Sequence, residues 1–354
     1  MGKKYWRALV VGSCFSFIIC FVDPMRVMIS KGASMTSDYS IGAAFFYFFV
    51  IVIINSVIGK ISRKNFLGSE ELIIIFGMMA VSCAIPTWGF ALNLIPLLPG
   101  VYYYADPSWQ ESFIPYINKV ITVSDKNAVE WFFEGLPKGC AIPWDKWIFP
   151  LTLWFILIFS VYLLSILVIY FLSNRWIEKE RLLYPLTIPP AELAKKENSF
   201  PPVMKDKLFY TGILIPFTIL SIYCLSIYFP SMPPLLLSRT YSIFRGTTGI
   251  NIRIVFEVIG FIYFVSLDVS FSLWFFFLLL TTQKGIFNLI GFGKVTPEPW
   301  AFTGIEAGYE CMGAMFMMVF IMLWQERHYL KSIFSDRQNR VYTVISIICF
   351  FIIV

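Results

Sequence analysis

Residues 147–185 read WIFPLTLWFILIFSVYLLSILVIYFLSNRWIEKERLLYP, and this stretch indicates the class of the protein. Its apolar part, 147–172, is longer than the roughly 20 residues with which a helix crosses about 30 Å of hydrocarbon. Five charged side chains then fall within the eleven residues RWIEKERLLYP (175–185). The stretch therefore predicts a membrane-spanning helix that ends at a water-exposed surface.

The rest of the chain has the same apolar character. Of its 354 residues, 58% are hydrophobic, 14% are charged and 37 are Phe, whereas soluble proteins have about 25% charged residues. The apolar runs lack the alternating polar positions of a membrane β-barrel. We therefore expect an all-α, polytopic helical integral membrane protein of the cell inner (plasma) membrane, with no nucleic-acid partner.

Eight apolar segments follow one another along the chain: 8–22, 41–59, 72–98, 147–172, 208–230, a long segment from 254, 305–324 and 341–354. They predict about seven or eight spans. The last segment has 14 residues, about 21 Å of helix, and no polar flank follows it. We therefore expect the chain to stop inside an incomplete helix.

The segments predict five parts of the chain. They are membrane helices 1–3 (1–98), an external Pro- and Trp-rich loop subdomain (99–146), membrane helix 4 (147–173), a cytoplasmic loop (174–207) and further membrane helices (208–354). The external loop predicts a helix over 125–134, capped by Ser124. We expect the loop to be a packed cap, either a lid over a site or an apron that holds helix ends together.

Lys and Arg residues predict the orientation, because they concentrate in cytoplasmic loops. The N-terminal flank carries three, residues 60–64 carry three and residues 175–207 carry seven, whereas 99–146 has four against six acidic residues. The N-terminus and 175–207 should then be cytoplasmic, and 99–146 external. The basic segment 327–340 should also be cytoplasmic, which simple alternation of the spans does not allow.

A broken or re-entrant segment between 254 and 304 would remove this conflict. Residues 254–290 would make one helix of about 55 Å, which is too long for a single crossing. The expected hinges are residues 266–270 around Asp268, or the glycines Gly285, Gly291, Gly293 and Gly304.

Three acidic residues in the apolar segments are candidates for substrate contact or proton coupling: Asp268, Glu306 and Glu310. Charges are costly in lipid and usually face a cavity or a partner. Glu306 and Glu310 lie four residues apart, on one face of a helix, beside the pair Gly304 and Gly308. Alternatively, both glutamates begin a helix at the interface, where the helix dipole favours them, and Asp268 caps a helix at a break.

Five further residues are structural or gating candidates: Glu180, Tyr184, Pro185, Pro86 and Asn55. Pro185 should end the helix of RWIEKERLLYP, so that Tyr184 rests at the headgroup level and the stretch anchors the chain at the cytoplasmic surface. Pro189 and Pro190 should then prevent a regular helix. Pro86 predicts a kink in the span 72–98, and Asn55 a hydrogen bond between helices. For 175–185 an ordinary solvated loop is the alternative.

The cysteines and the single histidine, His328, indicate no metal centre. Six of the seven cysteines fall within or at the ends of apolar segments, and the chain has no CxxC or HExxH motif. Zinc and haem take several imidazole or thiolate ligands. We expect no metal, no cofactor and no disulfide framework, and we assign no catalytic residue.

Four stretches carry a family resemblance: VSDKNAVEWFFEG (123–135), RWIEKERLLYPLTIPPAEL (175–193), LDVSFSLWFF (267–276) and GAMFMMVFIMLWQERHYL (313–330). In this order they resemble an uncharacterised family of large prokaryotic integral-membrane proteins, known as a domain of unknown function. The resemblance spans nearly the whole chain, and it implies members longer than this sequence.

That family is in turn distantly similar to the oligopeptide transporters, which have an acidic residue, a leucine and Tyr-Pro before a Gly-Thr-Ala stretch. Residues Glu180, Leu182, Tyr184 and Pro185 match this pattern, and residues 186–188, Leu-Thr-Ile, depart from its glycine-led part. The similarity implies transport of a peptide-like solute.

Together these observations predict a transporter or transporter-like permease that moves a small polar or peptide-like solute across the bilayer. Proton coupling through Asp268, Glu306 or Glu310 is expected because a carboxyl group in a low dielectric titrates closer to the working pH. One alternative is a membrane-embedded transferase that acts on a lipid-linked substrate and uses external carboxylates such as Asp106, Glu111 or Asp125. Another is a non-catalytic membrane scaffold.

Overall fold

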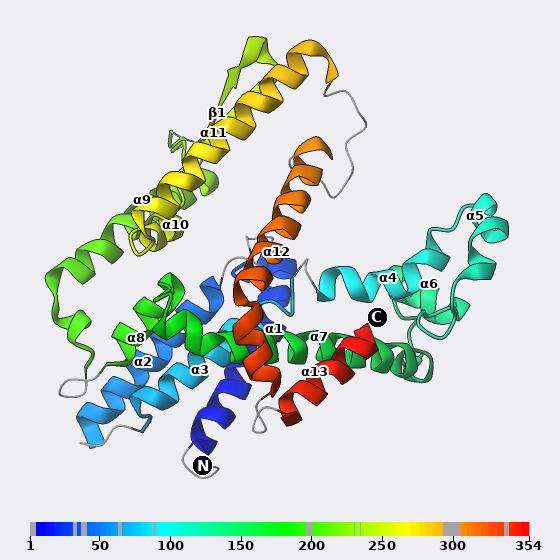
Figure 1. Cartoon of the computed structure of the whole chain (residues 1–354), viewed down its shortest axis with the longest axis horizontal. Helices are drawn as coiled ribbons and strands as arrows, with labels where there is room; N and C mark the ends of the chain where they lie inside the picture. Colours follow the sequence, from blue (N-terminus) through cyan, green and yellow to red (C-terminus); the bar gives the residue numbers. More distant parts are fainter. Residues whose placement is uncertain are drawn as a thin grey trace. The chain divides into compact units, whose positions relative to one another are not determined.

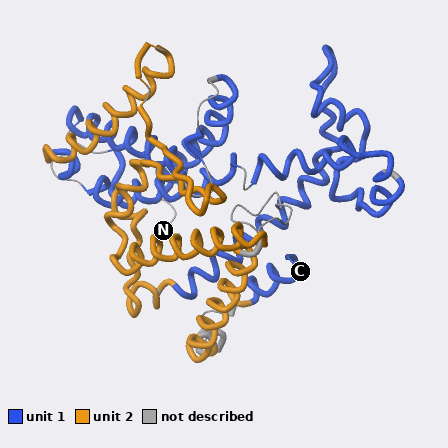
Figure 2. The backbone as a smooth tube through the Cα atoms, turned by 90° about the horizontal axis from the view of Figure 1, so that it is seen from above, with its two compact units in different colours: residues 1–172, 190–205, 344–354 blue, residues 173–189, 206–343 orange. Residues whose placement is uncertain are grey.

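Helices dominate the computed structural model of the protein (Figure 1). The structure describes residues 5–30, 34–36, 41–62, 66–87, 90–195, 200–229, 231–233, 235–292, 305–335 and 340–353. It divides into two compact units, shown in Figure 2: unit 1 comprises 1–172, 190–205 and 344–354, and unit 2 comprises 173–189 and 206–343. Each unit is described by itself.

Unit 1 begins with a three-helix bundle. Its helices are α1 (Trp6–Ser30), α2 (Gly42–Ser62) and α3 (Ser69–Ser82), and α1 and α3 are the most extensively packed pair of helices in the chain. Ile19, Phe48 and Met79 are completely buried between them. Gly12 permits the close approach of α1 and α3, since a Cβ atom at this position would lie 2.5 Å from the sulfur of Met78. The bundle therefore has a closely packed apolar interior.

The part of unit 1 that was expected to be external follows the bundle. Its elements are α4 (Ala91–Tyr103), α5 (Pro107–Ser112), η1 (Ile114–Tyr116), α6 (Lys126–Glu134) and the start of α7 (Trp144–Glu178). Leu98, Val123, Ala128 and Trp147 form a small buried core. The indole of Trp154 also donates a hydrogen bond of 2.9 Å to the carbonyl of Ile121. The loop subdomain is thus a packed cap on the first turns of α7.

The helix expected over 125–134 is present as α6, but its N-cap differs from the expectation. Asp125, not Ser124, is the capping residue, and its carboxylate accepts a hydrogen bond of 3.0 Å from the backbone N–H of Ala128. Both residue types cap helices well, and the chain enters the helix one residue later than the sequence indicated.

Unit 2 contains most of the remaining elements. They are η2 (Pro185–Thr187), α9 (Lys207–Tyr228), β1 (Ser238–Ile243), η4 (Phe244–Gly246), β2 (Thr248–Arg253), α10 (Phe256–Ile262), α11 (Leu267–Ile290) and α12 (Ile305–Ser335). The short helices α8 (Ile188–Ala194) and η3 (Pro202–Lys205) belong mainly to unit 1, as does most of α13 (Arg340–Ile353).

A β-hairpin was not expected in this all-helical sequence. Strands β1 and β2 are antiparallel, with Tyr241 opposite Ile250, and the hairpin runs beside α11 (Figure 1). Its tip packs on the C-terminal part of α11, where a Cβ atom at Gly285 would lie 2.2 Å from the ring of Phe244. The side chain of Asn288 donates hydrogen bonds to Thr247 and Thr248. The hairpin is a minor part of a helical fold.

The long apolar segment from 254 is broken at its N-terminal end. Helix α10 ends at Ile262 and α11 begins at Leu267, with Ser266 as its N-cap. Gly285 is not a hinge, because α11 runs through it and uses it for the contact with Phe244. Gly291, at φ +80°, ends α11 in the left-handed conformation that favours glycine. Gly293 and Gly304 lie outside the described residues.

Six helices in the described part of the chain are long and apolar enough to cross a membrane: α1, α2, α7, α9, α11 and α12. The expected span 72–98 is not one helix, because α3 ends at Ser82 and α4 begins at Ala91. Helices α4 and α13 are apolar but shorter than a crossing requires. Large apolar side chains are exposed along α9, α11 and α12, which suggests a membrane protein, since water disfavours such surfaces.

The stretch RWIEKERLLYP ends its helix earlier than expected. Helix α7 stops at Glu178, and Arg181 adopts a left-handed conformation at φ +49°. Pro185 therefore begins the short helix η2 and does not end a longer one. Pro189 and Pro190 lie in the first turn of α8, where a missing N–H costs no hydrogen bond, so the expectation of no regular helix there was wrong.

Candidate functional site

The most deeply buried carboxylate among the described residues belongs to Asp23, in α1 within the apolar segment Trp6–Ile29. The residue is 5% exposed. Its Oδ2 accepts hydrogen bonds of 2.6 Å from the hydroxyls of Ser34 and Thr36, and one of 3.2 Å from the N–H of Thr36. The carboxylate thus holds the chain that leaves α1 against that helix.

The second oxygen of Asp23 is equally occupied. Oδ1 accepts hydrogen bonds from Nη2 of Arg26 at 2.9 Å, from Nε of Arg26 at 3.3 Å and from the N–H of Met35 at 3.2 Å. A buried charge is tolerated when it is paired and hydrogen-bonded in this way. Among the residues that the structure describes, no group of three or more His, Cys, Asp or Glu side chains could hold a metal ion.

An interruption of the helical backbone lies beside this carboxylate. Helix α3 ends at Ser82. The backbone carbonyl of Ser82 accepts a hydrogen bond of 3.7 Å from the thiol of Cys20 in α1. The following residue, Cys83, is buried and close enough to Asp23 and Cys20 to interact with them electrostatically. Pro86 is buried in the connection that follows. It therefore separates α3 from α4, where the sequence predicted a kink within one span.

Asp23 and the interruption lie at similar heights above the start of the bundle. The hydroxyl of Tyr5 donates a hydrogen bond of 2.9 Å to Glu70, so that α1 and α3 begin on the same side. Asp23 follows Trp6 by about 25 Å of helix, and Ser82 follows Ser69 by about 20 Å. A buried charge and a non-helical backbone thus meet in the far half of the bundle.

Asn55 connects α2 to the residue before the α3 N-cap. It is 3% exposed, its amide nitrogen donates to the carbonyl of Leu67 at 3.2 Å, and its amide oxygen accepts from the N–H of Leu67 at 3.0 Å. Both backbone groups of Leu67 are thereby satisfied. This arrangement is structural and leaves the side-chain oxygen and nitrogen of Asn55 occupied.

Asp268 lies at the surface of unit 2. It is exposed in the first turn of α11, where the helix dipole stabilises a negative charge. With Ser272 and Phe276 it lines a shallow hollow in that surface. Asp268 thus lies at the break, but Ser266 is the N-cap of α11 and no side chain accepts a capping hydrogen bond there.

Glu310 links two helices of unit 2. It is exposed in α12 and accepts a hydrogen bond of 2.5 Å from the side chain of Gln283 in α11. Glu306 lies in the first turn of α12, and its side chain is outside the described residues. The structure thus gives Glu310 a partner on another helix.

Glu180 belongs to a charged cluster that joins the end of α7 to α12. Its carboxylate accepts a hydrogen bond of 3.2 Å from Nε of Arg175, and Arg175 also forms an ion pair with Glu326, which is 9% exposed. The ring of Tyr329 lies 5.9 Å from the cationic groups of both Arg175 and Lys179. We call these five residues the helix-end cluster. The sequence shows the charged residues of both helices, but it does not indicate that the two groups are in contact.

Tyr184 and Pro185 are close to this cluster in sequence but do not belong to it. Tyr184 is 41% exposed, at φ −112° and ψ 81°. Its carbonyl accepts hydrogen bonds from the N–H and the hydroxyl of Thr187. The two residues therefore shape a turn at the surface of unit 2.

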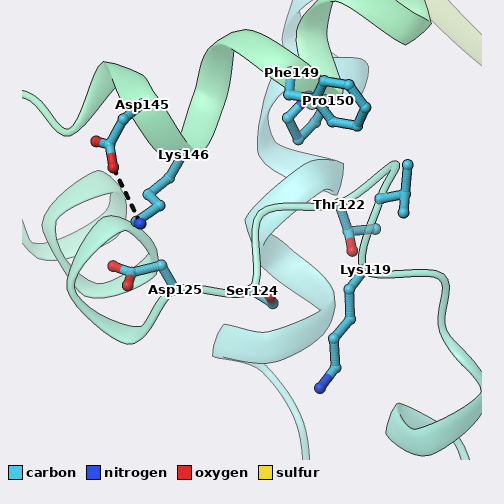
Figure 3. Close-up of a pocket in the computed structure, with 9 residues that line it drawn as sticks. Lys119, Thr122, Ser124, Asp125, Asp145, Lys146, Phe149 and Pro150 are labelled. Carbon is cyan, nitrogen blue, oxygen red and sulfur yellow. Dashed lines mark ion pairs between the residues drawn. The ribbon is translucent and has the colours of Figure 1, made fainter.

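The three carboxylates considered for a transferase have separate positions. Asp106 precedes α5, Glu111 is exposed within α5, and Asp125 caps α6. Figure 3 shows a polar pocket of about 350 Å³ in which Asp125 lies near Asp145 and Lys146, themselves an ion pair of 3.1 Å. Because Asp125 is engaged in capping, the pocket offers no free pair of carboxylates from the residues considered.

Sequence reasoning did not select Asp23, which directly follows the apolar run 8–22, as a candidate site residue. The signal that could have found it is the short polar stretch Ser-Met-Thr at 34–36, which follows Asp23 at the distance of a returning loop. Short hydroxyl-bearing residues are frequent partners of a buried carboxylate.

A comparison with protein families found one match, to a family of unknown function, DUF6785, over residues 3–343. Comparisons with curated proteins and with solved structures found no match. The likeness to oligopeptide transporters therefore stays a prediction from the motif around Tyr184 and Pro185. With a match that covers nearly its whole length, this chain belongs to the family of unknown function DUF6785.

Proposed function

We propose that the protein is a membrane transporter or transporter-like permease for a small polar or peptide-like solute. The observation that carries the proposal is the buried Asp23 beside the interrupted backbone between α3 and α4. Non-helical backbone at membrane depth is tolerated where it is buried in protein or lines a cavity. Secondary transporters build their binding sites from such discontinuous helices.

The chemistry of this region suits a zwitterionic solute. Asp23 is held as a fixed negative charge by its donors, and the side chain of Arg26 beside it is 34% exposed. A guanidinium group can bind a carboxylate through two parallel hydrogen bonds. Arg26 would therefore bind the solute carboxylate, and the negative field of Asp23 would favour its ammonium group.

The proposed topology has a cytoplasmic N-terminus in the cell inner membrane. The ion pair between Arg175 and Glu326 supports a common side for residues 175–207 and 327–340, because two spanning helices whose ends touch must end on the same side. Between these ends, α9, α11 and α12 give three crossings, and an even number is required. The contact of α10 with η2 supports a return of the chain before α11, which supplies the missing crossing.

Proton coupling through an acidic side chain is the second part of the proposal. Asp268, Glu306 and Glu310 are its candidates, and Glu310 accepts a hydrogen bond from Gln283 of another helix. A carboxyl group that changes partners during transport could carry a proton.

Uptake into proteoliposomes tests the transport proposal. Purified protein should accumulate at least one member of a panel of amino acids, short peptides and other small polar solutes above protein-free liposomes. Arg26→Gln should reduce this uptake, whereas Arg245→Gln, an exposed arginine in the hairpin turn, should not. Turnover of a polyprenyl-linked donor without flux would replace the proposal by the transferase, and neither activity would favour the scaffold.

Accessibility labelling tests the topology. Single cysteines in 99–146, 175–207 and 327–340, in a background without native cysteines, are treated with an impermeant thiol reagent. The first region should label from outside and the other two from the cytoplasmic side. Labelling of 327–340 from outside would contradict the return before α11.

A further inference from the structure

The external part of unit 1 contains an apolar pocket of about 410 Å³. Ten residues line it and none is charged; the side chains that matter most are those of Trp131, Phe132, Leu136, Trp144, Trp147 and Leu151. We call it the aromatic pocket. Its volume and apolar lining are those of small-molecule sites. The only polar side-chain groups of its lining are the indole N–H groups of three tryptophans, which can donate a hydrogen bond but not accept one.

The aromatic pocket is an open continuation of the small core of this part. On its closed side Trp147 is 7% exposed and its ring lies 5.3 Å from that of Phe132. On its open side Leu136, Ile142 and Trp144 are 45%, 50% and 56% exposed. Helix α6 and the first turns of α7 thus hold the pocket open, and its rim is an apolar surface without cover in the chain described.

The position of the pocket indicates what covers the rim. Trp144, Trp147 and Leu151 belong to the first turns of the apolar segment Trp144–Ser173, the longest of the six that could cross a membrane. The wall of the pocket is therefore continuous with a surface suited to hydrocarbon. Tryptophans at the end of such a segment lie at the boundary between headgroups and hydrocarbon.

The apolar lining of the pocket limits the class of ligand that it can bind. A charged ligand would lose its hydration without gaining an ionic partner, and a polar ligand would find no side-chain acceptor among the lining residues, which costs free energy. A hydrocarbon chain needs no hydrogen-bonding or ionic partner, and its transfer from water into the pocket has a favourable free energy. A chain of a lipid in the adjoining leaflet needs only to bend towards the protein to enter.

We propose that the aromatic pocket binds one hydrocarbon chain of a membrane lipid and thereby holds the external subdomain on the bilayer surface. The assignment does not depend on transport, since the pocket lies apart from Asp23 in the sequence and in its lining residues. Its ligand is recognised by its apolar chain, whatever headgroup it carries.

Photo-crosslinking in lipid nanodiscs tests the assignment. The full chain is reconstituted with a phosphatidylglycerol or phosphatidylethanolamine probe that bears a diazirine at the end of one acyl chain. After irradiation, labelled peptides are identified by mass spectrometry. Labelling should concentrate on peptides that contain Trp131, Leu136 and Trp144, relative to the exposed η1 segment of the same subdomain.

Two variants separate occupancy from general contact with lipid. Leu136→Asp places a charge in the pocket at an exposed position and should reduce pocket labelling about tenfold. The matched control, Tyr116→Asp, alters a side chain that is 87% exposed and outside the pocket, and should leave labelling unchanged. Ile142→Trp fills the pocket without adding charge and should also reduce labelling.

Unchanged labelling in both Leu136→Asp and Ile142→Trp would overturn the proposal. So would uniform labelling over the whole subdomain, which would indicate only non-specific lipid contact. Displacement of the probe by a water-soluble apolar peptide, with no competition from unlabelled phospholipid, would instead assign the pocket to a peptide. Circular dichroism and the melting temperature of each variant confirm that it is folded.

Discussion

Asp23 and Asp268 are both aspartates of long apolar segments, and the fold treats them in opposite ways. Asp23 is 5% exposed and has six hydrogen bonds from Arg26, Ser34, Met35 and Thr36. Asp268 is exposed in the first turn of α11, where it needs only water and the helix dipole. An acidic residue in an apolar run therefore marks either a buried network or a helix end.

The surroundings of the two carboxylates explain the difference. Asp23 belongs to a bundle in which α1, α2 and α3 bury each other, and a returning loop supplies hydroxyl and amide donors. Asp268 begins a helix that buries only Thr281 and Gly285. Burial of a charge requires donors from other parts of the chain, which the bundle provides for Asp23 and the start of α11 does not provide for Asp268.

The largest effect expected from this comparison is that of Asp23→Ala. The substitution removes the acceptor of six hydrogen bonds and the ion pair with Arg26, which should destabilise the protein by about 3 kcal/mol. The melting temperature in detergent measures it, with Asp268→Ala as the matched control. If the two variants melt alike, the contrast between the buried and the exposed aspartate fails.

The helix-end cluster extends the comparison to unit 2. Arg175→Ala leaves Glu326, whose side chain is 11% exposed, without its ion-pair partner, and should cost about 2 kcal/mol. A double-mutant cycle with Glu326→Gln should give a clear coupling free energy, since the residues are in contact. The control is Lys195→Ala, which breaks an exposed pair with Glu192 and should change stability by about 0.5 kcal/mol or less. Additive effects of Arg175→Ala and Glu326→Gln would argue against the pair.

Asn55 offers an uncharged version of the same comparison. Asn55→Leu removes the two hydrogen bonds between the side chain of Asn55 and the backbone of the buried Leu67, and should cost about 1.5 kcal/mol. Hydrogen exchange at the amide of Leu67 should become faster, with little change in the middle of α3. Thr218→Val, at an exposed position of α9, is the control and should have no such effect. Unaltered exchange at Leu67 would separate Asn55 from the stability of this connection.

The smallest effect on stability is expected from Asp268→Asn. Loss of an exposed charge from the first turn of a helix should cost about 0.5 kcal/mol. The variant is most informative in the transport assay. If Asp268 couples protons, Asp268→Asn should lose the pH dependence of uptake while folding normally. Uptake that keeps the wild-type pH dependence would leave Asp268 as a helix-end residue and shift the search to Glu306 and Glu310.

The membrane class followed from the sequence alone, because crossing a bilayer makes a local demand. About 20 apolar residues in succession satisfy it, wherever they stand in the chain. Helices α1, α2, α7, α9, α11 and α12 lie in segments identified in this way. The break near Ser266 and the helix α6 were also predictable, since an excessive length and a capping pattern are local features too.

Only the tertiary structure decided which polar residues are buried and which partners they bind. The hydrogen bonds of Asp23 come partly from a loop whose residues follow it by 11 to 13 positions and fold back against α1. The ion pair of Arg175 and Glu326 joins residues about 150 positions apart. The aromatic pocket forms only because α6 lies on the first turns of α7. The interruption between α3 and α4 and the β-hairpin on α11 likewise depend on neighbours. Hydropathy measures each residue against solvent, whereas burial of a charge depends on donors that folding brings from elsewhere.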